Sequence, residues 1–308
     1  MNTTPNYGRR FDLCQLEQRV GEAQFSLASC SLCPLACGVD RLKKRGACTT
    51  SRWAEVASFN AHFGEEPPIS GKTGSGTIFF SHCNLHCIYC QNYPISQFGN
   101  GRTIQPLELA DMMMNLQQRG CHNVNFVTPS HMVAQILEAL LIAVKRGFCL
   151  PLVYNTSGYD SPKALALLDG IIDIYMPDMR YSNNEIAALL SGVKDYVEVN
   201  RAAIHEMHRQ VGDLQLDQNG IAVRGLLIRH LILPNDLAGT RQTLRFIAQE
   251  ISPHSHISLM SQYFPAHLAT GHAQIGRRIT RAEYTKAVLA LEEFGLENGW
   301  LQDSSELE

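Results

Sequence analysis

The chain lacks any long, uninterrupted run of apolar residues. Its longest apolar stretch, residues 132–154, is broken by Gln135, Glu138, Lys145 and Arg146, and such side chains are costly inside a bilayer. The N-terminus, "MNTTPNYGRRFDLC", has neither the apolar segment nor the small-residue cleavage site of a secretory signal. These absences predict a cytoplasmic protein with no membrane-spanning segment.

The sequence also lacks a basic block, an internal repeat and a low-complexity segment. Its 26 Lys and Arg residues face 29 Asp and Glu residues, which gives a formal net charge of −3 at pH 7. A surface that follows a phosphate backbone needs clustered positive charge, so binding to nucleic acid is unsupported. The 308 residues are 45% hydrophobic, which is enough to bury a large core.

From residue 76 onward, short β-branched runs alternate with longer segments of helical periodicity. The alternation predicts about six βα units around a parallel sheet, either open and doubly wound or curled into a barrel. The expected strands are residues 77–82, 123–129, 152–158, 171–178, 226–234 and 257–265. The expected helices are residues 106–119, 131–146, 161–168, 195–212, 241–251 and 280–295.

The same pattern divides the chain into three parts. Residues 1–75 lack the βα alternation and predict a separate, cysteine-rich N-terminal extension, residues 76–295 predict the barrel core, and residues 296–308 predict a polar, fraying C-terminal tail. Within the core, Asn219-Gly220 is a strong hairpin signal. It predicts a hairpin over residues 213–225 that leans over the mouth of the barrel.

Ten cysteines in a cytoplasmic chain indicate metal or redox chemistry rather than disulfides. Cys83, Cys87 and Cys90 stand at C-x3-C-x2-C spacing directly after the first expected strand. Thiolates suit zinc, copper(I) and iron–sulfur clusters. A closed zinc site would need a fourth ligand, such as His82 or His86. In a four-iron cluster, three thiolates leave one iron free of protein ligands, and that open iron is a place for reaction.

A second group, Cys30, Cys33, Cys37 and Cys48, has enough thiolates to close a metal site by itself. Its spacing is compatible with a structural zinc ion or with an additional [4Fe–4S] cluster. An auxiliary cluster is the favoured interpretation, because an electron relay or a substrate anchor suits redox chemistry at the first group.

The stretch "CNLHCIYCQN", residues 83–92, resembles the cluster loop of radical S-adenosylmethionine (SAM) enzymes. Tyr89 and Asn92 match the subgroup that activates glycyl-radical enzymes, such as pyruvate formate-lyase-activating enzyme. Further stretches make nearly the whole chain similar to the pyruvate formate-lyase-activating-enzyme-like (PflX-type) proteins. These stretches are "CSLCPLACGVDRL", "HFGEEPPISGKTGSGTIFFSH", "VTPSHMV", "PLVYNTSGYDS", "IDIYMPDMRY" and "GLLIRHLILP".

The resemblance implies a fold and a chemistry. The fold would be α/β, a partial (βα)6 TIM-type radical SAM barrel with the small cysteine-rich N-terminal extension. Cys83, Cys87 and Cys90 would hold a [4Fe–4S] cluster whose open iron SAM chelates through its amino and carboxylate groups. Reductive cleavage of SAM would give a 5′-deoxyadenosyl radical that abstracts hydrogen from the substrate.

The resemblance also implies partners. A flavodoxin or ferredoxin would supply the electron, and a glycyl-radical enzyme or another protein would be the substrate. Two alternatives remain open. One is a radical SAM enzyme that modifies RNA or a peptide, and the other is a non-catalytic iron–sulfur or zinc interaction protein.

By the same resemblance, SAM would contact polar residues at the strand ends. In "DIYMPDMRY", Asp178 and Arg180 resemble the Asp-x-Lys strand end of the activases, and arginine keeps the positive charge of the usual lysine. Strand alternation turns only one of Arg229 and His230 inward, and the resemblance favours Arg229. Many relatives bind the SAM amino group with a Gly-Gly-Glu stretch where this chain has "VTPSH". The candidates for SAM binding are Tyr89, Asn92, Thr128, Ser130, Asn155, Asp178, Arg180 and Arg229.

Overall fold

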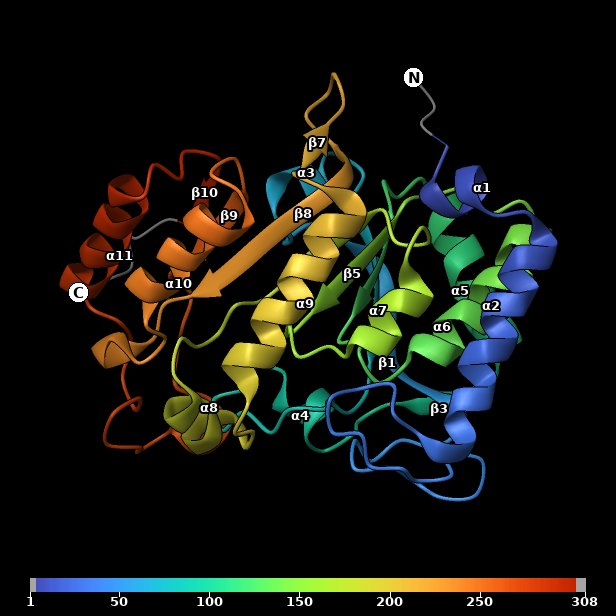
Figure 1. The fold of residues 1–308 in the computed structure, drawn as a ribbon, viewed down its shortest axis with the longest axis horizontal. Coiled ribbons are helices and arrows are strands. Elements are labelled where there is room, and N and C mark those ends of the chain that lie inside the picture. Colours follow the sequence, from blue (N-terminus) through green and yellow to red (C-terminus); the bar gives the residue numbers. More distant parts are fainter. Residues whose placement is uncertain (1–3, 303–308) are drawn as a thin grey trace.

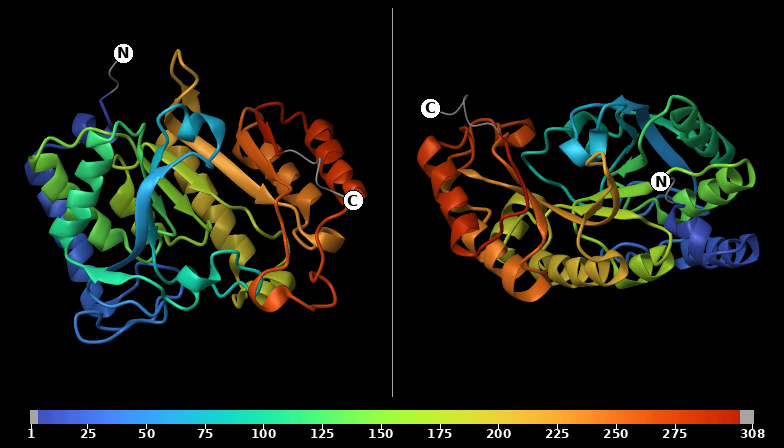
Figure 2. Two further views of the ribbon diagram at one scale, coloured as in Figure 1. Left: turned by 180° about the vertical axis from the view of Figure 1, so that it is seen from behind. Right: turned by 90° about the horizontal axis from the view of Figure 1, so that it is seen from above.

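Ten strands form one curved sheet that stays open (Figure 2). The structure is a computed structural model and describes residues 4–302. Its strands are β1 (Ala54–His62), β2 (Ser75–Phe80), β3 (Arg102–Ile104), β4 (Val124–Val127), β5 (Leu152–Thr156), β6 (Ile174–Pro177), β7 (Gln215–Leu216), β8 (Ala222–Leu231), β9 (His256–Met260) and β10 (Gly299–Leu301). Along the sheet they follow the order β10-β9-β8-β6-β5-β4-β2-β1-β3, with β7 paired to β8 beside this path.

Neighbouring strands from β2 to β10 along this order are parallel, whereas β1 pairs antiparallel with both β2 and β3. Parallel strands that follow one another through crossovers end at the same edge of the sheet. The segments that leave β2, β4, β5, β6, β8 and β9 therefore gather at one end of the molecule, and this end carries the site described below.

The longer helices cover the outer face of the sheet (Figures 1 and 2). The helices of the described residues are α1 (Asn6–Arg10), α2 (Leu13–Phe25), α3 (Pro67–Ser70), α4 (Tyr93–Ser96), α5 (Pro106–Gln118), α6 (Val133–Lys145), α7 (Pro162–Leu168), α8 (Asn184–Ser191), α9 (Tyr196–Val211), α10 (Thr240–Phe246) and α11 (Arg281–Glu293). The short helices α3 and α4 each contribute a residue to the lining of the cavity described below. A π-helical turn, η3 (Ile247–Ile251), extends α10, and η1 (Ser26–Ser29), η2 (Pro234–Asp236) and η4 (His267–Ala269) are 3₁₀ turns. No helix within residues 4–302 has the length and apolar character needed to cross a bilayer.

The predicted fold class is confirmed: the protein is α/β, with an open, largely parallel sheet that makes a partial barrel. All six expected strands are present as β2, β4, β5, β6, β8 and β9, and the six expected helices are present as α5, α6, α7, α9, α10 with η3, and α11. The sequence reading missed α8, a helix of 8 residues whose two turns are too short for periodicity to register.

The predicted cysteine-rich N-terminal segment is present, and the elements on either side of it pack into the main fold. Strand β1 hydrogen-bonds along β2 and so belongs to the main sheet. In α2, the buried positions Leu16, Val20 and Ala23 recur at helical spacing and join the same apolar core as the barrel. A single amphipathic helix must bury its apolar stripe against another element, and here α2 packs on α6.

Two further expectations need correction. The hairpin at Asn219-Gly220 exists, since β7 pairs antiparallel with β8, but it precedes β8 and therefore lies at the opposite end of the sheet from the barrel mouth (Figure 1). In the expected tail, Gly299–Leu301 do not fray, because they add β10 beside β9. The remainder of that predicted tail, residues 303–308, lies outside the described residues.

Candidate active site

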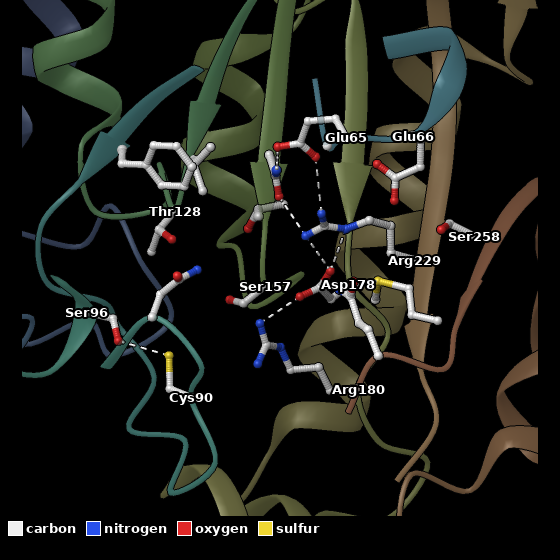
Figure 3. A pocket seen from close by; sticks show the side chains of 18 of the residues that line it. Glu65, Glu66, Cys90, Ser96, Thr128, Ser157, Asp178, Arg180, Arg229 and Ser258 are labelled. Atoms are coloured by element: carbon white, nitrogen blue, oxygen red, sulfur yellow. Dashed lines mark hydrogen bonds and ion pairs between the residues drawn. The ribbon is translucent and has the colours of Figure 1, made fainter. Parts of the chain in front are cut away.

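A cavity of about 470 Å³ opens inside the partial barrel, at the end where the parallel strands finish (Figure 3). Three parts of the chain line it: the cysteine loop after β2, the ends of β4, β5, β6, β8 and β9, and the loop after β1. The cavity thus brings together side chains that lie far apart in the sequence, among them Glu65, Cys83, Asp178 and Gln262.

The cysteine loop places Cys83, Cys87 and Cys90 on the same cavity. Backbone bonds hold the loop in place, because the N–H of His86 donates to the carbonyl of Ser191 at 3.2 Å. Each sulfur also has a polar neighbour. Cys83 Sγ accepts from the N–H of Leu85 at 3.4 Å, Cys87 Sγ accepts from the hydroxyl of Ser191 at 3.0 Å, and Cys90 Sγ lies 3.1 Å from Ser96 Oγ.

Burial disfavours the thiolate form of Cys83 and Cys87 in the protein alone. It raises the pKa of Cys83 to about 12 and also raises the pKa of Cys87, although the nearby guanidinium of Arg180 opposes both shifts. Within residues 4–302, no three His, Cys, Asp or Glu side chains converge on a point suited to a single metal ion. The fit to an iron–sulfur cluster therefore rests on the donor set, three soft sulfurs in a partly buried loop beside a positive charge.

Asp178, Arg180 and Arg229 form a charged chain in the middle of the cavity (Figure 3). The carboxylate of Asp178 accepts from Arg180 Nη2 at 2.6 Å and from Arg229 Nε at 2.9 Å. Arg180 Nη1 also lies 3.4 Å from Cys87 Sγ, and Arg229 Nη2 donates to Asn155 Oδ1 at 2.8 Å. The expected inward direction of Arg229 agrees with this geometry. Two guanidinium groups in one cavity can bind a carboxylate with a planar pair of donors.

Burial alone lowers the pKa of Arg229, but the negative charges of Asp178, Glu66 and Glu65 outweigh it and raise that pKa. Arg229 is therefore a permanent cation in the cavity. His230, its neighbour on β8, faces the other way and is fully buried, where its ring nitrogens lie 2.6 Å from the Met179 carbonyl and 2.9 Å from Thr240 Oγ1.

Glu65 and Glu66 are the site residues that sequence reasoning missed. They follow β1 in a segment outside the βα pattern, and both line the cavity. Glu65 Oε2 lies 3.7 Å from Arg229 Nη1, and Glu65 Oε1 accepts from Asn155 Nδ2 at 3.5 Å. Burial raises the pKa of Glu65 to about 7, with Arg229 opposing the shift. The only available signal was the Glu-Glu pair itself, inside the quoted stretch "HFGEEPPIS".

The other predicted contact residues divide into two sets. Asn92, Thr128 and Asn155 line the cavity. Two others turn away from it: the hydroxyl of Tyr89 lies 2.6 Å from that of Tyr181 in the core, and Ser130 Oγ lies 2.9 Å from Thr156 Oγ1. These two positions support the loop and the strand ends through packing and hydrogen bonds.

In the "VTPSH" stretch, Val127 and Thr128 line the cavity. The backbone of Thr128 is left-handed, with a φ of 60°. The carbonyl of Pro129 accepts from the N–H of Met132 at 2.8 Å, and Ser130 Oγ lies 2.9 Å from Thr156 Oγ1. Thr128 is therefore the polar side chain of this stretch that lines the cavity.

Gly158 fixes the turn beside Asp178. It has a φ of 71°, and a Cβ at this position would overlap both the Asn200 side chain and the Asp178 carbonyl. Asn200 Nδ2 donates to the carbonyls of Gly158 and Asp178 at 3.1 and 3.0 Å. The turn therefore depends on the absence of a side chain.

We expect Gly158→Ala to lower the free energy of unfolding by about 2–5 kcal/mol, because left-handed strain and overpacking act together. Gly147→Ala is the matched control. Gly147 also has a positive φ, of 86°, but a Cβ there would meet nothing within 4 Å, so only the strain of about 1–2 kcal/mol applies. Urea unfolding of both variants measures the difference. Equal losses would contradict the predicted clash.

The second cysteine group lies close to the first. Burial raises the pKa of Cys33 to about 12, and the neighbouring sulfurs of Cys48, Cys30 and Cys37 add to the rise. Arg41 is 1% exposed and its guanidinium lies 4.0 Å from Cys30 Sγ. Its other hydrogen-bond partners in the described chain are neutral: the carbonyls of Ser51 and His131 and the hydroxyl of Thr50.

A side-chain contact connects the two cysteine groups. Thr49, next to Cys48, has its hydroxyl 2.6 Å from Nδ1 of His82, the residue before Cys83. His82 has a left-handed backbone, with a φ of 66°, and its Nε2 lies 3.2 Å from Glu55 Oε2 on β1. The cysteine-rich segment therefore packs against the start of the cysteine loop.

Comparison with known proteins agrees with this geometry. The family model described as Radical SAM superfamily matches residues 77–213. Uncharacterized protein MJ0674 of Methanocaldococcus jannaschii is 31% identical over 292 residues, which is 92% of this chain and 80% of that protein.

Two solved structures are also similar to this chain. The crystal structure of Streptococcus suis SuiB bound to S-adenosylmethionine is 10% identical over 74% of this chain and 51% of that one, with a TM-score of 0.50. Methylornithine synthase (PylB) is 12% identical over 97% of this chain and 82% of that one, with a TM-score of 0.45.

Proposed function

This chain belongs to the radical SAM superfamily, and on that premise we propose that Cys83, Cys87 and Cys90 hold its [4Fe–4S] cluster beside bound SAM. Enzymes of the superfamily use both cofactors and need an electron donor such as flavodoxin or ferredoxin. Together the cofactors supply a 5′-deoxyadenosyl radical that abstracts a hydrogen atom. The observation that carries the proposal is the placement of all three sulfurs on one cavity with Asp178, Arg180 and Arg229.

The protein's own residues bind and orient the cofactor in this proposal. Arg180 and Arg229 supply two fixed positive charges for the carboxylate of SAM, and Asp178 holds both guanidinium groups in position through its two oxygens. Asn92, Thr128 and Asn155 offer neutral polar contacts on the cavity wall. Leu85 and Tyr89, which are buried between the cysteines, limit the access of water to the loop.

We further propose that the reaction resembles that of the glycyl-radical-enzyme activases. The support is the sequence pattern of the cysteine loop and of the β6 end, where Arg180 stands in place of the usual lysine. Under this proposal the substrate is another protein, which approaches the cavity. The enzyme itself works in the cytoplasm.

The test is reductive cleavage of SAM by the anaerobically reconstituted full chain. Reduction with dithionite in the presence of SAM should yield 5′-deoxyadenosine and methionine in equal amounts, quantified by mass spectrometry. A reconstituted protein that carries iron and sulfide but forms neither product above the protein-free control would overturn the proposed function.

We also propose that Cys30, Cys33, Cys37 and Cys48 hold a second [4Fe–4S] cluster. Arg41 supports this assignment, because a buried guanidinium with neutral oxygen partners needs a negative neighbour, and a metal centre with four thiolates carries net negative charge. A zinc ion bound by the same four thiolates would meet the same charge requirement, so metal content decides between them.

For the wild type we expect about eight irons per chain, and for the variant in which all four of these cysteines are alanine about four. Metal analysis after anaerobic reconstitution and desalting measures both. Because the cysteine trio is intact in that variant, it should still give a SAM-dependent change in the electron paramagnetic resonance spectrum of the reduced cluster. Wild-type protein with about four irons and one zinc would show that the second site is a zinc site instead.

A further inference from the structure

One carboxylate of the cavity forms no ion pair within the described residues. Three carboxylates, those of Glu65, Glu66 and Asp178, share the cavity with two guanidinium groups, those of Arg180 and Arg229. Asp178 is hydrogen-bonded to both arginines, and Glu65, whose pKa burial raises to about 7, lies within 3.7 Å of Arg229. Glu66 is the carboxylate that has no such ion pair.

Glu66 is nearly buried, at 9% exposure, and its Oε2 atom has no hydrogen-bond partner in the described chain. A buried carboxylate oxygen without a partner costs free energy, and a bound ligand can supply the missing hydrogen bond. Two more polar atoms of cavity residues, Ser157 Oγ and Arg180 Nε, are also buried and without a partner among the described residues. All three unsatisfied atoms belong to residues that line the same cavity, and Glu66 Oε2 is the one that carries negative charge.

The position of Glu66 separates it from the cysteines. Figure 3 shows Glu65 and Glu66 at one end of the cavity, Cys90 at the other, and Asp178 with Arg229 between them. Glu66 is held there by the backbone, because its carbonyl accepts from the N–H groups of Ile69 and Ser70 in the short helix α3. In the proposed function, Cys83, Cys87 and Cys90 would hold the cluster and SAM beside it, which would leave the end of the cavity at Glu66 for another molecule.

We propose that the end of the cavity formed by Glu65 and Glu66 binds a cationic nitrogen of the substrate, a primary ammonium or a guanidinium group, with Glu66 as its main acceptor. The inference rests on the proposed function, since it assigns the remaining part of that cavity to the second reactant. A cation here would give Oε2 of Glu66 a hydrogen-bond donor and would also give this carboxylate an ion pair.

The same arrangement excludes the opposite class of substrate. A carboxylate or phosphate at this end would face Glu65 and Glu66 at short range, and like charges in a partly buried site repel strongly. A neutral alkyl group would leave Oε2 of Glu66 buried and unpaired. The substrate should therefore carry its positive charge on the part that enters this end of the cavity.

Binding of simple probes to the reconstituted full chain with SAM present tests the inference without turnover. Pentylammonium, pentylguanidinium, 1-pentanol and pentanoate share a chain length and differ in charge. Isothermal titration calorimetry should show that one or both of the cations bind about tenfold or more tighter than 1-pentanol and pentanoate. Neither 1-pentanol nor pentanoate can donate a charge-assisted hydrogen bond to Glu66. The tighter cation identifies whether the group is an ammonium or a guanidinium.

Glu66→Gln keeps the shape of the side chain and removes its charge. It should weaken binding of the preferred cation by about tenfold or more, and this loss should exceed any loss of SAM affinity by at least about fivefold. Glu293→Gln is the control, because Glu293 pairs with Arg241 on the surface, 44% exposed and away from the cavity. It removes the same charge and should change neither affinity.

Three results would overturn the inference. The wild-type protein could bind 1-pentanol as tightly as the cations, or the Glu66→Gln variant could bind the cations as tightly as the wild type does. In the third result, Glu66→Gln would lose affinity for the cation and for SAM equally, which would assign Glu66 to SAM itself. None of these depends on cleavage, so a wild-type protein that forms no 5′-deoxyadenosine would defeat the proposed function separately.

Discussion

Replacement of Cys87 by alanine should abolish formation of 5′-deoxyadenosine, with a loss of more than about 1,000-fold, or about 4 kcal/mol of barrier. Cys87 is the most enclosed sulfur of the trio by its contacts, bonded to the Ser191 hydroxyl and 3.4 Å from Arg180. Without Cys87, two cysteines of the trio would be left to hold the proposed cluster. The sulfur that lies next to Arg180 would also be lost.

Two measurements separate loss of the cluster from loss of the fold. Iron content and the visible absorption of the reconstituted Cys87→Ala variant should fall, whereas its circular dichroism should match that of the wild type. Cys149→Ala is the control, because Cys149 is exposed and lies outside the cavity. Wild-type rates in Cys87→Ala with full iron content would assign the cluster to other residues.

Asp178→Asn should lower SAM affinity and the rate of its cleavage together by about 10- to 100-fold, since hydrogen bonds to charged groups contribute about 1.5–3 kcal/mol. The carboxylate accepts from Arg180 and Arg229 at once. An amide offers a single oxygen and no charge, so the two guanidinium groups would repel each other and lose their shared orientation.

The readout for Asp178→Asn combines SAM affinity, initial rate of 5′-deoxyadenosine formation and iron content. Iron content should stay at the wild-type level, because Asp178 contacts no cysteine sulfur directly. Asp111→Asn breaks a surface ion pair with Arg146 and is the control for loss of one negative charge. If affinity and rate in Asp178→Asn equal those of the wild type, the residue serves only to end strand β6.

Much of the candidate site could be read from the sequence because it follows regular elements. The cysteine spacing is local, and parallel strands carry Asp178 and Arg229 to the same edge once the βα alternation is recognised. Inward and outward directions at Arg229 and His230 follow from the two-residue period of a strand.

Glu65 and Glu66 could not be found this way. They enter the cavity from the segment after β1, whose antiparallel pairing with β2 is a long-range choice that periodicity does not encode. Tyr89 and Ser130 were placed in the site by resemblance, yet their side chains bond inside the core. The rotation of a side chain in an irregular loop depends on packing from distant elements, and a single sequence does not contain that information in readable form.

The contact between Thr49 and His82 joins two strained turns. Both residues have left-handed backbones, with φ values of 60° and 66°, and such conformations persist only where the surrounding structure holds them. The Thr49 hydroxyl lies 2.6 Å from Nδ1 of His82, so each turn is part of what holds the other. The packing of the segment that carries Cys48 and the shape of the loop that begins at Cys83 are thereby coupled at one side-chain contact.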